Sequence, residues 1–476
     1  MTTDTPPADA ATPAGPTVAV RYQPNTRAIR RYTLLYAVAG LGITLLAGSM
    51  ATILLPLHVQ QLEFVRVFTG ADAHVDLRAL TELKAQFDAG TLAPTTDQHR
   101  LLGLLDQFNS SRASSLSLVR SAGVFITMLI QPVVGMLSDR TRSPWGRRAP
   151  WIAAGSVAGA ALVALLPVAP SIAVLVIIWS LVQLAVDSAS GPHMTTVVDR
   201  VPASRVGALS TVTGLIVYIG GIGGSFVAGS LFAVIGLATY YPIAVALALT
   251  ALCFVLFARD RSSKELVVEP LRIHSFLTSY VRALGDRDFR WAWIAKVLLF
   301  IGYAIATVYG VYMLQSYVTP ALSVTEAARL APLLQIASLP AALIAMAISG
   351  RWSDKVGRRK PFVIAASIIM AMSFLVPFVW PTVTAMFIQG AMTGVGMGVF
   401  IVVDQALFID LLPHRESAGR DLGLANLGTS LGLALGPVLA GVIIVVSGGA
   451  YGPVWPIAFV LVIIAALAVL PIKRVR

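Results

Sequence analysis

The chain has 476 residues, of which 57% are hydrophobic and only 12% are charged. Its mean hydropathy of +0.79 is far above that of soluble proteins, so the composition excludes a set of soluble domains and predicts an all-α membrane protein. The apolar runs reach about 20 residues or more, enough to cross the hydrocarbon core as helices, whereas strands of a transmembrane barrel are about half as long.

The net charge of +12 does not indicate a nucleic-acid partner. Lys and Arg lie in short segments between apolar runs and not on one basic face, a distribution that membrane topology explains. The only cysteine, Cys253, lies inside an apolar run, so the chain can form neither an internal disulfide nor a cysteine-based metal site. We expect no cofactor and no metal, a monomer, and the lipid bilayer and a small solute as partners.

Residues 1–26 are rich in Pro, Ala and Thr and have no apolar periodicity, which predicts a disordered cytoplasmic tail. A basic cluster that ends at Arg31 precedes the first predicted span, 34–57. This span is too long for the apolar region of a signal peptide.

The longest polar interruption, residues 58–117, follows the first span. Residues 76–87 carry apolar side chains at near-helical spacing, and Asp97 is placed to cap a second helix that contains Leu101 and Phe108. We therefore predict a helical hairpin outside the membrane, either a packing element or a lid over a pathway through the membrane.

The remaining apolar runs follow in close succession, and with the first they make about twelve spans. They lie at 118–137, 150–168, 171–190, 206–235, 239–257, 291–315, 327–349, 361–380, 383–411, 422–446 and 453–471. The second long polar segment, 259–290, divides them into six and six. We expect an N-terminal half at 27–258, a central loop at 259–290 and a C-terminal half at 291–476.

A charged motif occurs once in each half, between the second and third spans and again between the eighth and ninth. The sequence GMLSDRTRSPWGRRAPW recurs in shorter form as GRWSDKVGRRKPF. The matched residues are Gly135, Asp139, Arg140, Gly146, Arg147 and Arg148 in the first copy and Gly350, Asp354, Lys355, Gly357, Arg358 and Arg359 in the second. Asp199 and Asp410 match in the same way, at the ends of the fourth and tenth spans.

Two halves with matching loops at matching places form a parallel repeat, which predicts a substrate site between them near the middle of the membrane. Both charged motifs, the central loop and the basic C-terminal end fall on one side, whereas the short turns on the other side, such as 169–170 and 236–238, lack Arg and Lys. The positive-inside rule then places both termini in the cytoplasm. We expect a multi-pass protein of the plasma membrane.

The two motifs are candidate cytoplasmic gates. Each acid lies at a helix end and each arginine pair follows a Gly turn, so the acid can accept charge-assisted hydrogen bonds when the cytoplasmic side is closed. The alternative is that these bases only set the topology.

Two acids lie inside predicted spans. Asp187 follows Gln183 by four residues and lies about 18 Å along the helix from Asp199, near mid-bilayer. A carboxylate there is costly unless it faces a cavity or a partner. We interpret Asp187 as a coupling or substrate-binding residue or as a structural contact, and the shallower Asp404 as a transport residue or a structural or gating contact.

Other polar residues in the spans admit two interpretations each. Arg120 is expected to snorkel or to pair with residues 58–117, with a substrate role as the alternative, and Lys296 is expected to snorkel. His193, next to Pro192, is a satisfied polar residue or a proton carrier. Tyr309 and Tyr312 suit a sugar ring, although anchoring and packing are common uses of Tyr at a span end.

Twelve spans with these motifs after the second and eighth resemble the major facilitator superfamily, over residues 30–472. The longer first turn, SDRTRSPWGRRAPW, resembles the loop of glycoside-pentoside-hexuronide cation symporters and sucrose-proton symporters, and Ser190-Gly191-Pro192 resembles a sucrose-symporter pattern. The resemblance implies alternating-access transport, with Asp187 close to a functional acid of melibiose-type members. Where those members carry cation-binding carboxylates, this chain has Thr127 and Gln131.

We therefore expect proton-coupled symport of a sugar, glycoside or similar small polar solute. The alternative is a proton-driven exporter, because Gly436-Pro437 resembles the antiporter signature of drug exporters, although in a different span. The sequence contains no phosphate loop, metal cluster or catalytic constellation that predicts an enzyme.

Overall fold

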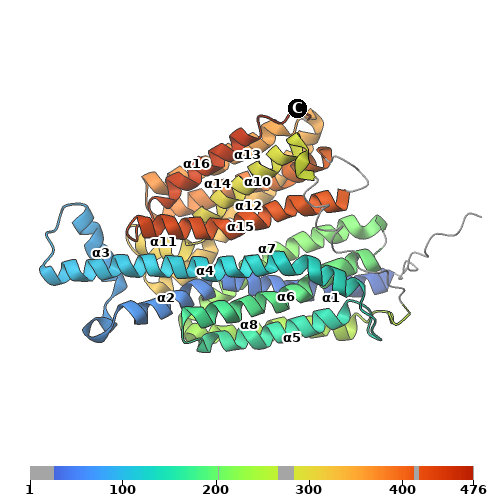
Figure 1. Ribbon diagram of the computed structural model, residues 1–476, viewed down its shortest axis with the longest axis horizontal. Helices are drawn as coiled ribbons and strands as arrows, with labels where there is room; N and C mark the ends of the chain where they lie inside the picture. The colour runs from blue at the N-terminus through green and yellow to red at the C-terminus, as the bar shows by residue number, and fades with distance from the viewer. Residues whose placement is uncertain (1–25, 202, 266–282, 412–417, 475–476) are drawn as a thin grey trace, which may run out of the picture.

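The computed structural model describes residues 26–201, 203–265, 283–411 and 418–474. Within these ranges every regular element is a helix. The predicted tail, except residue 26, and the middle of the predicted central loop, 266–282, lie outside the described residues. Figure 1 shows the helices nearly aligned with one another, with the N-terminal half in the lower part of the view and the C-terminal half in the upper part.

The N-terminal half is built from the following helices, in chain order. They are α1 (Thr26–Ser49), η1 (Met50–Leu54), α2 (Leu55–Val67), η2 (Gly70–His74), α3 (Leu77–Asp88), α4 (Thr96–Asp139), α5 (Ala149–Leu165), η3 (Leu166–Val168), α6 (Ile172–Arg200), α7 (Ala203–Ile235), η4 (Gly236–Thr239) and α8 (Tyr240–Phe257). The segment η1 is a π-helix, so α1, η1 and α2 form one continuous helical path.

The C-terminal half follows the same plan without a long polar insertion. Its helices are η5 (Ala283–Gly285), α10 (Arg287–Thr307), α11 (Gly310–Ser316), α12 (Val324–Val356), α13 (Lys360–Val379), α14 (Val383–Asp410), α15 (Ala418–Val446) and α16 (Val454–Ala468).

The helices account for the twelve predicted crossings. In the described part of the chain, ten continuous stretches are long and apolar enough to cross a membrane, and one of them, Val212–Phe257, contains most of α7 and all of α8. The shorter apolar helix α16 supplies the last crossing. The protein is therefore a multi-pass membrane protein with two six-helix halves.

The insert, residues 58–117, is built differently from the predicted hairpin. Its first helix is present as α3, capped by Asp76, but the second is the N-terminal part of α4, which continues without a break into the membrane. The cap of α4 is Thr95, whose side chain forms a capping box with Gln98, so the prediction of Asp97 as the cap is wrong. Figure 1 shows α3 and the start of α4 projecting beyond the bundle.

The two halves meet along two pairs of helices. α4 packs against α15, and α7 packs against α12. A glycine allows the second approach, because a Cβ at Gly229 of α7 would lie 2.2 Å from the carbonyl oxygen of Ala328 in α12. We call the end of the bundle that carries α3 the insert end, and the end that carries the two charged motifs the basic end.

Candidate functional site

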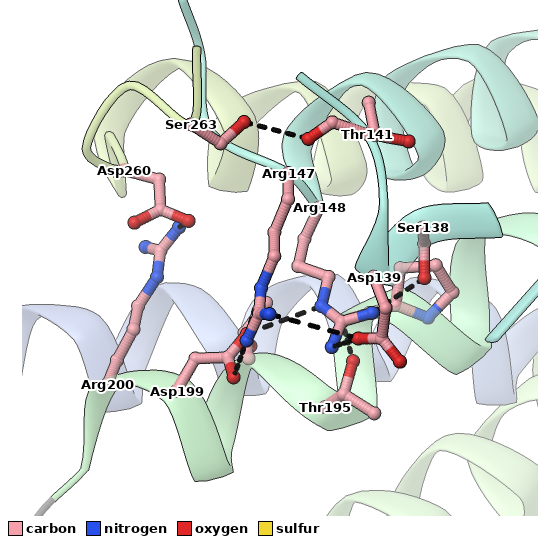
Figure 2. A network of polar contacts seen from close by, with 12 residues as sticks. Ser138, Asp139, Thr141, Arg147, Arg148, Thr195, Asp199, Arg200, Asp260 and Ser263 are labelled. Carbon is pink, nitrogen blue, oxygen red and sulfur yellow. Dashed lines mark hydrogen bonds and ion pairs between the residues drawn. The ribbon is translucent and has the colours of Figure 1, made fainter. Parts of the chain in front are cut away.

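The first charged motif forms a network of ion pairs at the basic end (Figure 2). Arg148 donates to Ser138 Oγ over 2.6 Å and is bonded to both Asp139 and Asp199. Arg147 donates to Asp199 over 2.5 Å. The acid at the end of α6 is thus tied to the turn that follows α4, and all of these residues belong to the N-terminal half.

The second motif repeats this arrangement in the C-terminal half. Arg359 donates to Ser353 Oγ over 2.8 Å and to Asp410 over 3.4 Å. These contacts match those of Arg148, although the side chain of Asp354 lies outside the described residues. The sequence predicts that the arginines contact the acids of their own motifs, but it does not predict that Asp199 and Asp410 are also their partners.

The other motif residues shape the turns. Gly146 and Gly357 have φ values of +88° and +65°, which favour glycine, while Gly135 and Gly350 lie within α4 and α12. Arg140 is half-buried, and Lys355 and Arg358 are exposed. The longer first turn packs on the start of the central loop, because Ser263 donates to Ser143 O over 2.9 Å and to Thr141 O over 2.8 Å (Figure 2).

A second polar network joins the two halves at the insert end. Arg112 of α4 donates from Nη2 to Ser316 Oγ over 2.6 Å and from Nε to the Tyr451 hydroxyl over 3.0 Å, and both partners belong to the C-terminal half. Its guanidinium also lies 4.5 Å from the ring centre of Tyr312. Gln60 donates to Gln315 across the same interface over 2.7 Å. We call this group, with Tyr309, the outer seal.

The two tyrosines predicted to suit a sugar ring lie in the outer seal. Tyr312 donates to Pro56 O over 2.6 Å and Tyr309 donates to Ala113 O over 2.8 Å, and both side chains are fully buried. In this conformation they pack between the halves, at and after the break between α10 and α11.

Asp187 lies in a polar cluster between α4 and α6. Thr127 Oγ1 donates to Asp187 Oδ2 over 2.5 Å, and Gln183 Nε2 donates to Thr127 over 3.2 Å. Among the ion pairs of the described residues none includes Asp187. The carboxylate therefore accepts a hydrogen bond from a neutral donor, Thr127, and is only partly buried.

The second half has no counterpart of this carboxylate. The register that aligns Gly135 with Gly350 places Ala342 at the position of Thr127, and the register that aligns Asp199 with Asp410 places Gly398 at the position of Asp187. A Cβ at Gly398 would lie 2.4 Å from the carbonyl oxygen of Ala342. One half thus holds a polar pair where the other has a close backbone contact.

Asp404 is buried and forms an ion pair with Lys296, with Nζ 2.8 Å from Oδ2. The prediction that Lys296 snorkels is wrong, because the side chain turns inward between α10 and α14 and its ammonium lies 4.9 Å from the Phe408 ring centre. A desolvated ammonium needs a nearby carboxylate, and Asp404 supplies it.

His193 occupies the position equivalent to Asp404 in the N-terminal half. Its ring stacks on Tyr36 at 4.3 Å, and Nε2 donates to Tyr36 O over 3.2 Å. Nε2 of the buried ring thus has a hydrogen-bond partner, and the two interpretations of His193, a satisfied polar residue or a proton carrier, stay predictions.

Arg120 contacts the π-helical segment η1. Because α4 begins at Thr96, Arg120 is roughly seven turns into a single helix. It donates from Nη1 to Ala51 O of η1 over 2.9 Å. This acceptor lies outside residues 58–117, and the interpretation of Arg120 as a snorkelling or a substrate-binding side chain stays a prediction.

A cavity of about 650 Å³ opens within the N-terminal half at the insert end, lined in part by His58, Glu63 and Ser115. Glu63 accepts from Arg66 and Ser115, and His58 Nδ1 lies 3.3 Å from the Tyr240 hydroxyl. In the described residues, no group of three His, Cys, Asp or Glu side chains is placed to hold a metal ion.

Three solved structures share this fold over 93% of the chain. The nucleoside transporter NupG has 14% identity, a TM-score of 0.67 and 98% of its own chain covered. The D-xylose-proton symporter has 14% identity, a TM-score of 0.62 and 98% covered. A bacterial homolog of the human lysosomal transporter Spinster, in an inward-facing conformation, has 14% identity, a TM-score of 0.59 and 96% covered.

No curated protein matches the sequence of this chain. The sequence profile of the Major Facilitator Superfamily, in contrast, matches residues 101–339 and 312–475, which is most of the chain. The matched regions include both charged motifs and the helices that join the two halves. This chain belongs to the Major Facilitator Superfamily.

Proposed function

We propose that this protein is a proton-coupled symporter of a sugar, glycoside or similar small polar solute that works by alternating access. The observation that carries the proposal is Asp187, a carboxylate in a membrane-spanning helix that accepts a hydrogen bond from the neutral hydroxyl of Thr127 and has no ion-pair partner among the described residues. A charged carboxylate is costly in this environment, and proton uptake removes the charge. The proton-bound form can therefore cross between the two access states more easily than the charged form.

The orientation follows from the distribution of bases. We place both termini and the basic end in the cytoplasm of a cell with this protein in its plasma membrane. The outer seal then closes the pathway toward the outside, where Arg112 joins the two halves. At the basic end, the pairs of Arg148 with Asp199 and of Arg359 with Asp410 each stay within one half. These contacts support an inward-facing conformation.

Two observations support a sugar-like solute. The longer first turn resembles that of the glycoside-pentoside-hexuronide and sucrose symporters, and in this structure it is the part of the motif that packs on the central loop through Ser143 and Ser263. In addition, a nucleoside and D-xylose, the solutes named for two structures with the same fold, both contain a sugar ring.

The proposal is tested with purified protein in liposomes. Labelled sugars and related small polar solutes are offered under an inward proton gradient, and we expect accumulation of at least one of them that stops when the gradient is dissipated. Extrusion of toxic cations with no accumulation of any sugar or related polar solute would instead identify a proton-driven exporter. That outcome would agree with the resemblance of Gly436-Pro437 to the signature of drug exporters.

A further inference from the structure

Two side chains from opposite halves meet the π-helical segment η1. Arg120 of α4 donates to Ala51 O over 2.9 Å, and Gln335 of α12 donates to Thr52 Oγ1 over 2.7 Å. Thr52 also accepts from Ser225 of α7 over 3.0 Å. A π-helical turn inside a longer helix is frequently found at a functional site.

Arg120 and Gln335 are related by the internal repeat. The register that aligns Gly135 with Gly350 also aligns Arg120 with Gln335. Each half therefore sends its equivalent long side chain to neighbouring residues of one segment. The two contributions differ in charge, because only the N-terminal half supplies a cation.

The charge of Arg120 is not balanced by the protein in this conformation. Among the described residues, no ion pair includes Arg120, and the side chains that interact with it electrostatically are the phenols of Tyr303 and Tyr309. A guanidinium has five N–H donors, and within the described residues Ala51 O is the acceptor that Arg120 uses. The side chain is half-buried, and its nitrogens are not among the fully buried polar atoms of the described chain that lack a hydrogen bond, so the donors that Ala51 does not use keep some exposed surface.

The position of this cation suits a solute site. Arg112 of the outer seal lies about two helical turns away on α4 toward the insert end, and Thr127, the partner of Asp187, lies about two turns away toward the basic end. The next residue, Ser121, donates across the interface to Ala434 O over 2.8 Å. Arg120 thus lies between the closed seal and the candidate proton carrier, at the contact of the two halves.

We propose that Arg120 binds a carboxylate of the transported solute, with Gln335 and Tyr303 as the neutral polar groups beside it. The solute is then a polyhydroxylated organic acid and not a neutral sugar. This inference rests on the proposed transport function and specifies its substrate class. Its charge balance fits the same scheme, since one carboxylate that moves with one proton carries no net charge across the membrane potential.

The test compares acids with uncharged molecules of the same skeleton, using the purified full-length protein. Gluconate is paired with sorbitol and glycerate with glycerol, and binding is measured by calorimetry and by ligand-dependent thermal stabilisation. We expect the acid of at least one pair to bind at least tenfold more tightly than its neutral counterpart. Arg120→Gln should lower the affinity for that acid by about 10- to 100-fold, because a charge-assisted contact is lost.

Two further variants keep the result interpretable. Arg120→Lys retains the cation and should retain a preference for the acid even if affinity falls. Arg30→Gln removes an exposed arginine at the start of α1 and should bind as wild type does. The inference fails if neither acid binds to the wild type, or if Arg120→Gln leaves the affinity for the acid unchanged.

The inference and the proposed function can fail separately. Proton-driven accumulation of a neutral sugar, with no binding of either acid, would leave symport intact and overturn the role of Arg120. Conversely, binding of an acid that depends on Arg120, without any accumulation under a proton gradient, would support the anion site and overturn proton symport.

Discussion

Lys296 and Asp404 form a buried ion pair inside the C-terminal half, with 2.8 Å between Nζ and Oδ2. The equivalent position in the N-terminal half holds His193, which hydrogen-bonds to Tyr36 O, stacks on the Tyr36 ring and forms no ion pair with any other described residue. The two halves of the repeat therefore differ at this equivalent position, with an ion-paired carboxylate in one half and a hydrogen-bonded imidazole in the other. In the C-terminal half, the buried charge of Lys296 is balanced by that of Asp404, so neither is stable in this site without the other.

Removing one partner of this pair should be more damaging than removing both. Lys296→Met leaves the Asp404 carboxylate buried without a cation and should cost about 3–5 kcal/mol of the free energy of unfolding. The double variant Lys296→Met/Asp404→Leu should regain most of that loss. Denaturation in detergent measures both, and equal losses in the single and the double variant would contradict the coupling.

The outer seal predicts a shift between access states. Arg112→Ala removes the hydrogen bonds that the guanidinium makes to Ser316 and Tyr451, so the insert end should open more often. In a Cys253→Ser background, a cysteine placed at Ala113, which is fully buried at this interface, should react with a maleimide several-fold faster. Arg100→Ala, at an exposed arginine of the insert, is the control and should leave the rate unchanged.

The insert itself should respond to acid. The Arg100 side chain hydrogen-bonds to Asp72 and holds the pKa of that carboxyl below its ordinary value. A depressed pKa in the folded state means that the contact stabilises η2 above the ordinary pKa and is lost as the pH falls through the folded value. Hydrogen-exchange protection of Gly70–His74 should therefore drop only below about pH 3.8.

Asp72→Asn should show the unprotected η2 already at neutral pH, with no further change in protection through the acid range. Glu82→Gln, in an exposed pair with Arg78, should behave as wild type. Protection that falls at the same pH in wild type and in Asp72→Asn would assign the acid response to another group.

The spans, the two-fold repeat and the turn glycines could be predicted from the sequence. Hydropathy finds helices whose length the bilayer sets, and Gly146 and Gly357 mark turns that need positive φ. The arginine partners Asp199 and Asp410 were already visible as a matched pair, but only the fold brings them beside Arg148 and Arg359.

The buried polar side chains that connect different helices were harder to predict. Arg112 lies in a polar segment whose sequence predicts a separate hairpin. The N-terminal part of α4 is polar and the rest is apolar, but the helix continues without a break between them. The pairing of Lys296 with Asp404 joins residues that are far apart in the sequence, and local spacing cannot show that they meet. The repeat register did contain one usable signal, since it aligns Arg120 with Gln335.

We propose that Asp187 carries the coupling proton, and the most direct test measures solute uptake and internal pH together in liposomes that contain the purified protein. The probe is the labelled solute that the wild type binds most tightly. Ser188→Ala is the matched control, because the Ser188 hydroxyl is bonded within its own helix to Leu184 O. It should accumulate the solute and acidify the lumen as wild type does. Asp187→Asn should lose accumulation and acidification while still exchanging internal for external solute, whereas uphill uptake with acidification at the wild-type level in Asp187→Asn would contradict the claim.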